Sequence, residues 1–172
     1  MAKVVLTVGD DISTDVIYPG RFMATVLPAE TPQFAFADNT EFNAQLKSKQ
    51  IAAGSIIVAG RNFGCGSSRE QAVSALKGHD LVIVAKSFAR IFLQNSVNLG
   101  LQLVEAPEIE ASANDELNIG ADIVENKTTG RRFSVIAFPK TRQEIIASGG
   151  LIPHTRKLIM EGRRGVSQRK NG

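Results

Sequence analysis

The chain has 172 residues, of which 43% are hydrophobic and 22% are charged, and its formal net charge is +3. These values are typical of one folded globular domain and argue against a disordered chain. No apolar run approaches the roughly 18 residues of a membrane helix, and no secretory signal is visible, so we expect no membrane partner. A single cysteine, Cys65, excludes an internal disulfide, and a cytoplasmic location is expected.

The same cysteine count limits the metal chemistry of the chain. An iron–sulfur cluster is held by several thiolates, and a structural zinc site takes about four ligands. The two histidines, His79 and His154, lie far apart in the sequence and do not complete a zinc site. We therefore expect no metal and no cofactor in this chain, and any metal chemistry would have to come from a partner.

The positive charge is concentrated at the C-terminus. Residues 151–172 hold six Lys or Arg against one acidic residue, Glu161, so residues 1–150 are net acidic. We expect a folded domain over residues 1–162, followed by a basic, flexible tail over 163–172. Such a tail can bind nucleic acid, but nothing before it resembles a base-reading motif, so no nucleic-acid partner is expected.

The hydrophobic pattern gives the elements in chain order. It predicts strands at 3–8, 55–59, 81–85 and 100–104, and helices at 38–50, 68–77 and 87–95, the last capped by Ser87. The alternation from 55 to 104 is typical of a parallel α/β core. A strand at 117–124 is then expected to pair with 131–138 as a hairpin, before helices at 141–147 and 151–160.

The loop Gly60-Arg-Asn-Phe-Gly-Cys-Gly-Ser-Ser-Arg-Glu70 carries the densest chemical signal. Its glycines allow positive φ and a close approach to a ligand. A helix that begins here would point free N–H groups at an anion, and Arg69 can bind a carboxylate through two N–H groups. The loop therefore predicts a site for a small anion. Ser67 and Glu70 also fit a capping box, so a purely structural role for Ser67 stays open.

This loop resembles the swivel-domain signature of the aconitase superfamily, in particular that of its dehydratase small subunits. Further matches are Gly9-Asp-Asp-Ile-Ser-Thr-Asp-Val-Ile-Tyr-Pro19 and Ala85-Lys-Ser-Phe-Ala-Arg-Ile-Phe92. The resemblance covers the chain to about residue 160. It implies a swivelling β/β/α domain with mixed sheets and flanking helices. It also implies the small subunit of a two-subunit hydro-lyase of leucine biosynthesis, which interconverts 2-isopropylmalate and 3-isopropylmalate. The large subunit would carry a [4Fe-4S] cluster.

The resemblance also implies roles for individual residues. Ser67 would be the base that removes a carbon-bound proton, and Ser68 and Arg69 would bind a carboxylate of a small dicarboxylic acid. Asp15 would support this site, although an Asx turn or an ion pair with an arginine would also explain it. The residues expected to support the substrate-contacting groups, without touching the substrate themselves, are Asp15, Gly64, Gly66 and Glu70.

The segment after Pro19 bears on substrate choice. In the superfamily this segment reaches the variable part of the substrate, and homoaconitase-type members place an arginine two residues after an aromatic. Here Arg21 precedes the aromatic, and the expected substrate-contacting residues are Phe22, Met23, Ala24 and Thr25. Burying an unpaired carboxylate against apolar groups is costly, so a branched-alkyl malate is favoured. A methylated malate or homoaconitate stays open, as does a non-catalytic anion-binding or regulatory module.

Overall fold

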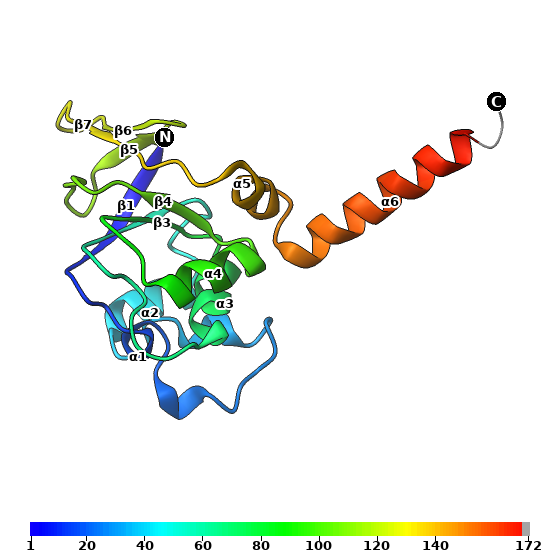
Figure 1. The fold of residues 1–172 in the computed structure, drawn as a ribbon. Helices are drawn as coiled ribbons and strands as arrows, with labels where there is room; N and C mark the ends of the chain where they lie inside the picture. Colours follow the sequence, from blue (N-terminus) through cyan, green and yellow to red (C-terminus); the bar gives the residue numbers. More distant parts are fainter. Residues whose placement is uncertain (170–172) are drawn as a thin grey trace.

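The computed structural model describes the backbone of residues 1–169 and side chains as far as Glu161. A mixed sheet runs in the order β4-β3-β2-β1-β5-β6-β7 (Figure 1). Its strands are β1 (Ala2–Val8), β2 (Ile56–Ala59), β3 (Val82–Ala85), β4 (Gln102–Glu105), β5 (Glu116–Ile119), β6 (Ile123–Asn126) and β7 (Arg132–Ser134). The α-helices are α1 (Thr14–Ile17), α2 (Thr40–Lys47), α3 (Glu70–Gly78), α4 (Arg90–Leu99), α5 (Lys140–Ala147) and α6 (Leu151–Arg169), and two 3₁₀ turns cover Gly20–Phe22 and Thr31–Phe34.

Strands β1 to β4 form the parallel half, as the alternation of elements predicted. Strand β2 pairs in parallel with β1 on one side and with β3 on the other, and β4 extends the sheet beyond β3. Every residue of β2 is buried, because both faces of a parallel sheet are covered. Ile57 and Ile83 pack into the cluster that holds the apolar faces of α2, α3 and α4.

The opposite face of the parallel half packs against the antiparallel half, strands β5 to β7. Val58 and Val84 share a second cluster with Leu117, Val124 and Phe133. The two halves of the sheet therefore lie as two layers of strands, and the helices form a third layer. This confirms the expected β/β/α arrangement and the mixed sheet with flanking helices.

The antiparallel half differs from the predicted hairpin in one respect. The strand expected over 117–124 is two strands, β5 and β6, joined by a turn in which the Gly120 N–H donates to the Ile123 carbonyl at 2.9 Å. Gly120 and Asp122 are turn-forming residues inside an otherwise strand-like stretch, and they interrupt it. The predicted hairpin is present as the β6–β7 pair, although β7 is shorter than the predicted 131–138.

Three predicted helix starts were wrong by two or three residues. Helix α2 begins at Thr40 and ends at Lys47, inside the predicted range 38–50. Helix α3 begins at Glu70 with Arg69 at the N-cap position and no side-chain cap, so Ser67 does not cap it. Helix α4 begins at Arg90, after Ala89, and not at Ser87. The Ser87 hydroxyl instead accepts a hydrogen bond from the Asn62 N–H at 2.9 Å. In both places the serine is engaged by a distant segment, which local sequence patterns do not show.

The C-terminal part lies at one side of the body. Gly149 and Gly150 have φ of 85° and 117°, and this left-handed turn sends α6 away from the sheet (Figure 1). The backbone of the expected tail is helical as far as Arg169, residues 170–172 lie outside the described part, and the flexibility of 163–172 stays a prediction. Within the described residues, no helix combines the length and apolarity needed to cross a membrane.

Candidate active site

The glycine loop leaves the end of β2 and crosses the segment that follows β1. The Gly64 N–H donates to the Ile12 carbonyl at 2.8 Å, and Cys65 forms a parallel bridge with Ser13. Gly64 has φ of 81°, and a Cβ there would lie 2.2 Å from the ring of Phe92. No other residue fits this position without moving the helix that carries Phe92. The loop is therefore fixed against both the segment after β1 and α4.

Thr14 holds the backbone and the hydroxyl of Ser67. The Thr14 N–H donates to the Cys65 carbonyl at 2.8 Å, and Thr14 Oγ1 donates to the Ser67 carbonyl at 3.1 Å. Thr14 Oγ1 also lies 3.2 Å from Ser67 Oγ. Thr14 is 2% exposed, whereas Ser67 is exposed to solvent. The sequence reasoning missed Thr14, although Ser-Thr-Asp stands within one of the motifs used for the resemblance.

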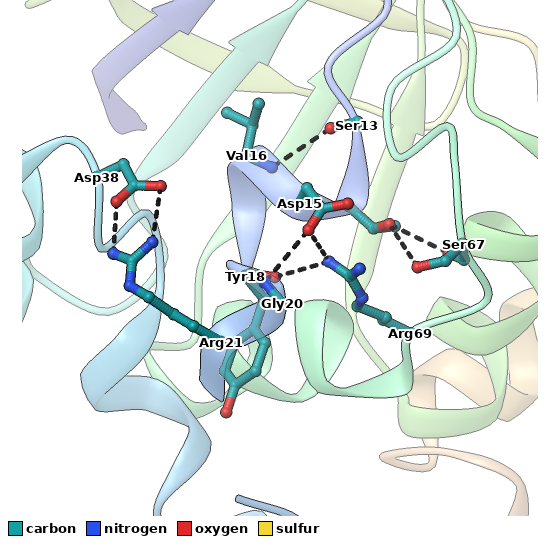
Figure 2. A network of polar contacts seen from close by, with 10 residues as sticks. Ser13, Asp15, Val16, Tyr18, Gly20, Arg21, Asp38, Ser67 and Arg69 are labelled. Carbon is teal, nitrogen blue, oxygen red and sulfur yellow. Dashed lines mark hydrogen bonds and ion pairs between the residues drawn. The ribbon is translucent and has the colours of Figure 1, made fainter. Parts of the chain in front are cut away.

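Asp15 and Arg69 form an ion pair next to Ser67 (Figure 2). Arg69 Nη1 also donates to the Tyr18 carbonyl at 3.2 Å, and the Gly20 N–H donates to Asp15 Oδ1 at 3.2 Å. The hydrogen bond from Arg69, with its positive charge, lowers the pKa of Asp15, and the Gly20 N–H adds to this. Of the two structural alternatives considered for Asp15, the structure shows the ion pair with an arginine.

The remaining hydrogen-bonding capacity of Arg69 points to a ligand. Its Nε atom is buried and has no hydrogen-bond partner among the described residues. An N–H of a charged guanidinium that lacks an acceptor is costly, and a carboxylate oxygen would satisfy it. The guanidinium is thus held by Asp15 through Nη1, and its side chain remains 13% exposed, with hydrogen-bonding capacity that the described residues do not use.

Ser67, Ser68 and Arg69 come immediately before the first turn of α3. Ser68 and Glu70 are exposed, and no side chain caps the helix. The partial positive charge of the helix N-terminus therefore lies beside these residues with no side chain bound to its N–H groups, although Glu70 places one carboxylate in the first turn. Among the described residues, Thr14 is the one side chain within hydrogen-bond distance of Ser67 Oγ. The site thus presents a hydroxyl, a partly neutralised arginine and a helix end on an open surface.

The residues expected to contact the variable part of the substrate form one turn, in which the Thr25 N–H donates to the Phe22 carbonyl at 3.0 Å, and they differ in exposure. Phe22 is half-buried and its ring stacks on Phe34 with 4.2 Å between centroids. Met23 and Ala24 are exposed and Thr25 is half-buried. Arg21 forms an ion pair with Asp38 and lies apart from the Ser67 and Arg69 group (Figure 2). Within residues 1–169, no three His, Cys, Asp or Glu side chains are close enough to hold a metal ion.

Comparison with known proteins places these observations in a family. Residues 12–108 match the model of the aconitase C-terminal domain. The 3-isopropylmalate dehydratase small subunit of Methanosarcina mazei is 39% identical over 158 residues, which cover 89% of this chain and 94% of the relative. The 2,3-dimethylmalate dehydratase small subunit of Eubacterium barkeri is 42% identical over 149 residues, covering 84% and 89% of the two chains.

A solved structure shows the same fold. The crystal structure of 3-isopropylmalate dehydratase from Methanocaldococcus jannaschii superposes with a TM-score of 0.81 at 34% identity, and the match covers 99% of this chain and 98% of that one. The matched segment 12–108 contains the glycine loop, Thr14, Asp15 and the start of α3. The chain belongs to the aconitase C-terminal domain family, among relatives that are dehydratase small subunits.

Proposed function

We propose that this chain is the small subunit of a two-subunit hydro-lyase that interconverts 2-isopropylmalate and 3-isopropylmalate in leucine biosynthesis. The observation that carries the proposal is the exposed Ser67 beside Arg69, whose buried Nε has no partner among the described residues. Relatives about 40% identical over most of the chain are named dehydratase small subunits. An open half-site of this kind fits a protein that acts only when a large subunit covers it.

In the proposed reaction, Ser67 moves the proton. Its deprotonated Oγ removes the proton from one substrate carbon, the C–O bond on the neighbouring carbon breaks, and the hydroxyl takes a second proton, supplied by solvent or by the large subunit, and leaves as water. Re-addition reverses both transfers: water gives up that second proton and adds its hydroxyl to the first carbon, while Ser67 returns its proton to the second. A serine hydroxyl is a weak base at neutral pH, and the uncapped end of α3 and the charge of Arg69 favour its deprotonated form.

Arg69 and Ser68 hold the substrate for this step. The Arg69 guanidinium, whose side chain is 13% exposed, would donate to a substrate carboxylate, and the exposed Ser68 hydroxyl would donate to the same group. Asp15 keeps the guanidinium in place through Nη1. Holding the reacting carbon near Ser67 supplies much of the rate that a positioned base can give.

The residues of this chain do not fit an iron–sulfur cluster. The one cysteine, Cys65, is engaged in the loop, where its Sγ donates to the Asp11 carbonyl at 3.3 Å. A cluster needs several thiolates, so we propose that the large subunit holds it, where it would supply Lewis-acid chemistry for the departing hydroxyl. We also propose a cytoplasmic location, which fits a reduced cysteine.

The substrate that we propose carries a branched alkyl group. Arg21 is paired with Asp38 and is not free to bind an extra carboxylate, while Met23 and Ala24 are apolar and exposed. The Eubacterium barkeri relative is named for 2,3-dimethylmalate, so a smaller methylated malate is the second candidate. Tricarboxylates are expected to be poor substrates.

Mixing experiments test the proposal. The purified chain alone is expected to be colourless and inactive, and adding the large subunit of the same organism, with its cluster, is expected to give isomerisation. We expect kcat/KM to be highest for isopropylmalate, lower for 2,3-dimethylmalate and lowest for homocitrate. A tight complex without turnover of any of the three would favour a non-catalytic anion-binding module. A kcat/KM highest on homocitrate would show that an arginine reaches the distal carboxylate.

A further inference from the structure

We propose that Thr14 is a positioning residue for the Ser67 hydroxyl, an inference that rests on the proposed function of Ser67. Thr14 Oγ1 lies 3.2 Å from Ser67 Oγ and donates to the Ser67 carbonyl at 3.1 Å. The two residues are 53 positions apart in the chain, so this contact depends on the fold. Thr14 thus fixes both the backbone and the side chain of the proposed base.

The Thr14 hydroxyl is itself held in place from several sides. The Thr14 N–H donates to the Cys65 carbonyl at 2.8 Å, and its carbonyl accepts from the Tyr18 N–H at 2.8 Å. The side chain is 2% exposed, and a β-branched side chain is stiff about χ1. Gly66, at φ of 93°, brings the loop to this point, and a Cβ there would lie 3.5 Å from Thr14 Oγ1. Thr14 Oγ1 is therefore held in one position, from which it orients the hydroxyl of the exposed Ser67.

The Thr14 hydroxyl can place its single hydrogen in two hydrogen-bond arrangements. A threonine hydroxyl has one hydrogen, and it has two oxygens of Ser67 within reach. When Ser67 is protonated, Thr14 donates to the Ser67 carbonyl and accepts the hydrogen of Ser67 Oγ. When Ser67 is deprotonated, the Thr14 hydrogen rotates to donate to the Ser67 alkoxide. Thr14 keeps its own proton in both arrangements, and its donation stabilises the anionic form.

Thr14 and Asp15 are neighbours in the chain, and each positions a different group of the site. Thr14 points its hydroxyl at Ser67, and Asp15 pairs with Arg69. One short segment after β1 therefore positions both the proton-transferring group and the carboxylate-binding group. Asp15 acts on substrate binding through Arg69, whereas Thr14 is expected to act on the proton-transfer step through Ser67.

Four variants of the full chain, each assayed in complex with the large subunit, test this inference. T14V removes the hydroxyl and keeps the shape, T14S keeps the hydroxyl, and S67A and the double variant T14V/S67A complete a cycle. For T14V we expect a kcat about 10- to 100-fold below wild type, with KM for isopropylmalate nearly unchanged, because a displaced base loses rate and not ground-state binding. T14S is expected to restore most of kcat.

Two further readouts separate positioning from general stability. T14V is expected to have no additional effect on kcat in the S67A background, because Thr14 acts through Ser67. Thermal unfolding of each small subunit shows whether a kcat loss tracks stability.

The outcomes distinguish the inference from the function on which it rests. A wild-type kcat in T14V, or an equal kcat loss with and without Ser67, overturns the role of Thr14 while leaving that of Ser67 intact. A near-normal kcat in S67A overturns the proposed role of Ser67 itself. If T14V does not fold, T14C replaces it, because its thiol is a weak donor of similar size. The same kcat loss is then expected, and wild-type kcat in T14C overturns the inference.

Discussion

The two halves of the sheet use polar side chains in opposite ways. In the antiparallel half, Asn126 is fully buried, and its amide donates to Asp115 at 2.8 Å and accepts from the N–H groups of Thr128 and Thr129. In the parallel half, Ser67 is exposed, and the buried Arg69 Nε has no partner among the described residues. Polar groups satisfied within the chain stabilise the fold, whereas groups left with free capacity are available to a ligand. Variants in the first half should therefore change the free energy of unfolding, and variants in the second should change turnover.

The largest effect is expected from S67A in the parallel half. Because a base acts only in the transition state, kcat of the complex is expected to fall by roughly 10²–10⁴-fold, with little change in KM. The unfolding temperature of the small subunit is expected to stay the same, since Ser67 is exposed and caps no helix. The matched control is S134A, at an exposed serine of β7, which is expected to leave kcat unchanged. A normal kcat in S67A would contradict the expectation that variants in the parallel half change turnover.

The next effect is expected from R69K. A lysine ammonium does not reproduce the planar guanidinium that binds Asp15 through Nη1 and offers Nε on another edge. The loss of one hydrogen bond to a charged group predicts a rise in KM for isopropylmalate of about 10- to 100-fold. The control is R131K, at an arginine of the antiparallel half that pairs with Glu110 on the surface, and its KM is expected to match wild type. Steady-state kinetics that show equal KM in both variants would contradict the role of Arg69.

The parallel half is also the part that the sequence predicts best. Its two central strands, β2 and β3, are short, uniformly apolar runs, and the residues that decide their structure are near neighbours in the chain. The glycine loop predicted an anion site, and the resemblance added the roles of Ser67 and Arg69. The β/β/α arrangement was confirmed, although the split between β5 and β6 was missed.

The errors share a physical cause. Ser67 was a candidate cap because Ser-x-x-Glu is a local pattern, but its contact with Thr14 spans 53 residues and cannot be read from neighbours. Ser87 was expected to cap the helix that follows it, but its hydroxyl accepts from the N–H of Asn62, 25 positions earlier. Local patterns give the strands and helices, whereas the precise partners of a site come from segments that the fold brings together. The substrate contacts of Phe22, Met23, Ala24 and Thr25 stay predictions.

A smaller effect, on stability alone, is expected from N126A in the antiparallel half. The substitution removes a side chain that is 0% exposed, takes one of two donors from Asp115, and leaves the N–H groups of Thr128 and Thr129 without their acceptor. A buried hydrogen-bonding group left unsatisfied costs about 1–3 kcal/mol, so the free energy of unfolding should fall by this amount. Urea denaturation measures it, and N118A, at an exposed asparagine of β5, is the control. In the complex, kcat of N126A is expected to equal wild type, and a matching loss of kcat would show that the halves are coupled.

The smallest effect is a difference in pH dependence between the two halves. The N–H of Ser112 and the amide of Asn126 lower the pKa of Asp115, and the hydrogen bond from Arg69 lowers the pKa of Asp15. A carboxyl whose pKa is lower in the folded state binds fewer protons than in the unfolded chain, so its contribution is present above the unfolded value of about 3.9 and is lost as pH falls through the folded pKa. Replacing either aspartate by asparagine should therefore flatten the fall in unfolding free energy below about pH 5.

The flattening is expected to be larger in D115N than in D15N. Asp115 is 8% exposed and its donors belong to the fold, whereas the Asp15 side chain is 60% exposed and its ion pair is screened by water and salt. Urea denaturation from pH 3 to pH 6, at low and at high salt, measures both slopes. High salt is expected to reduce the Asp15 contribution and to leave that of Asp115 nearly unchanged, because hydrogen bonds from the backbone and a neutral amide carry no net charge to screen. Two results would show that the polar groups of both halves are equally open to solvent. One is a contribution of Asp115 to the unfolding free energy that depends on salt. The other is an unfolding free energy that changes as little with pH in D15N as in D115N.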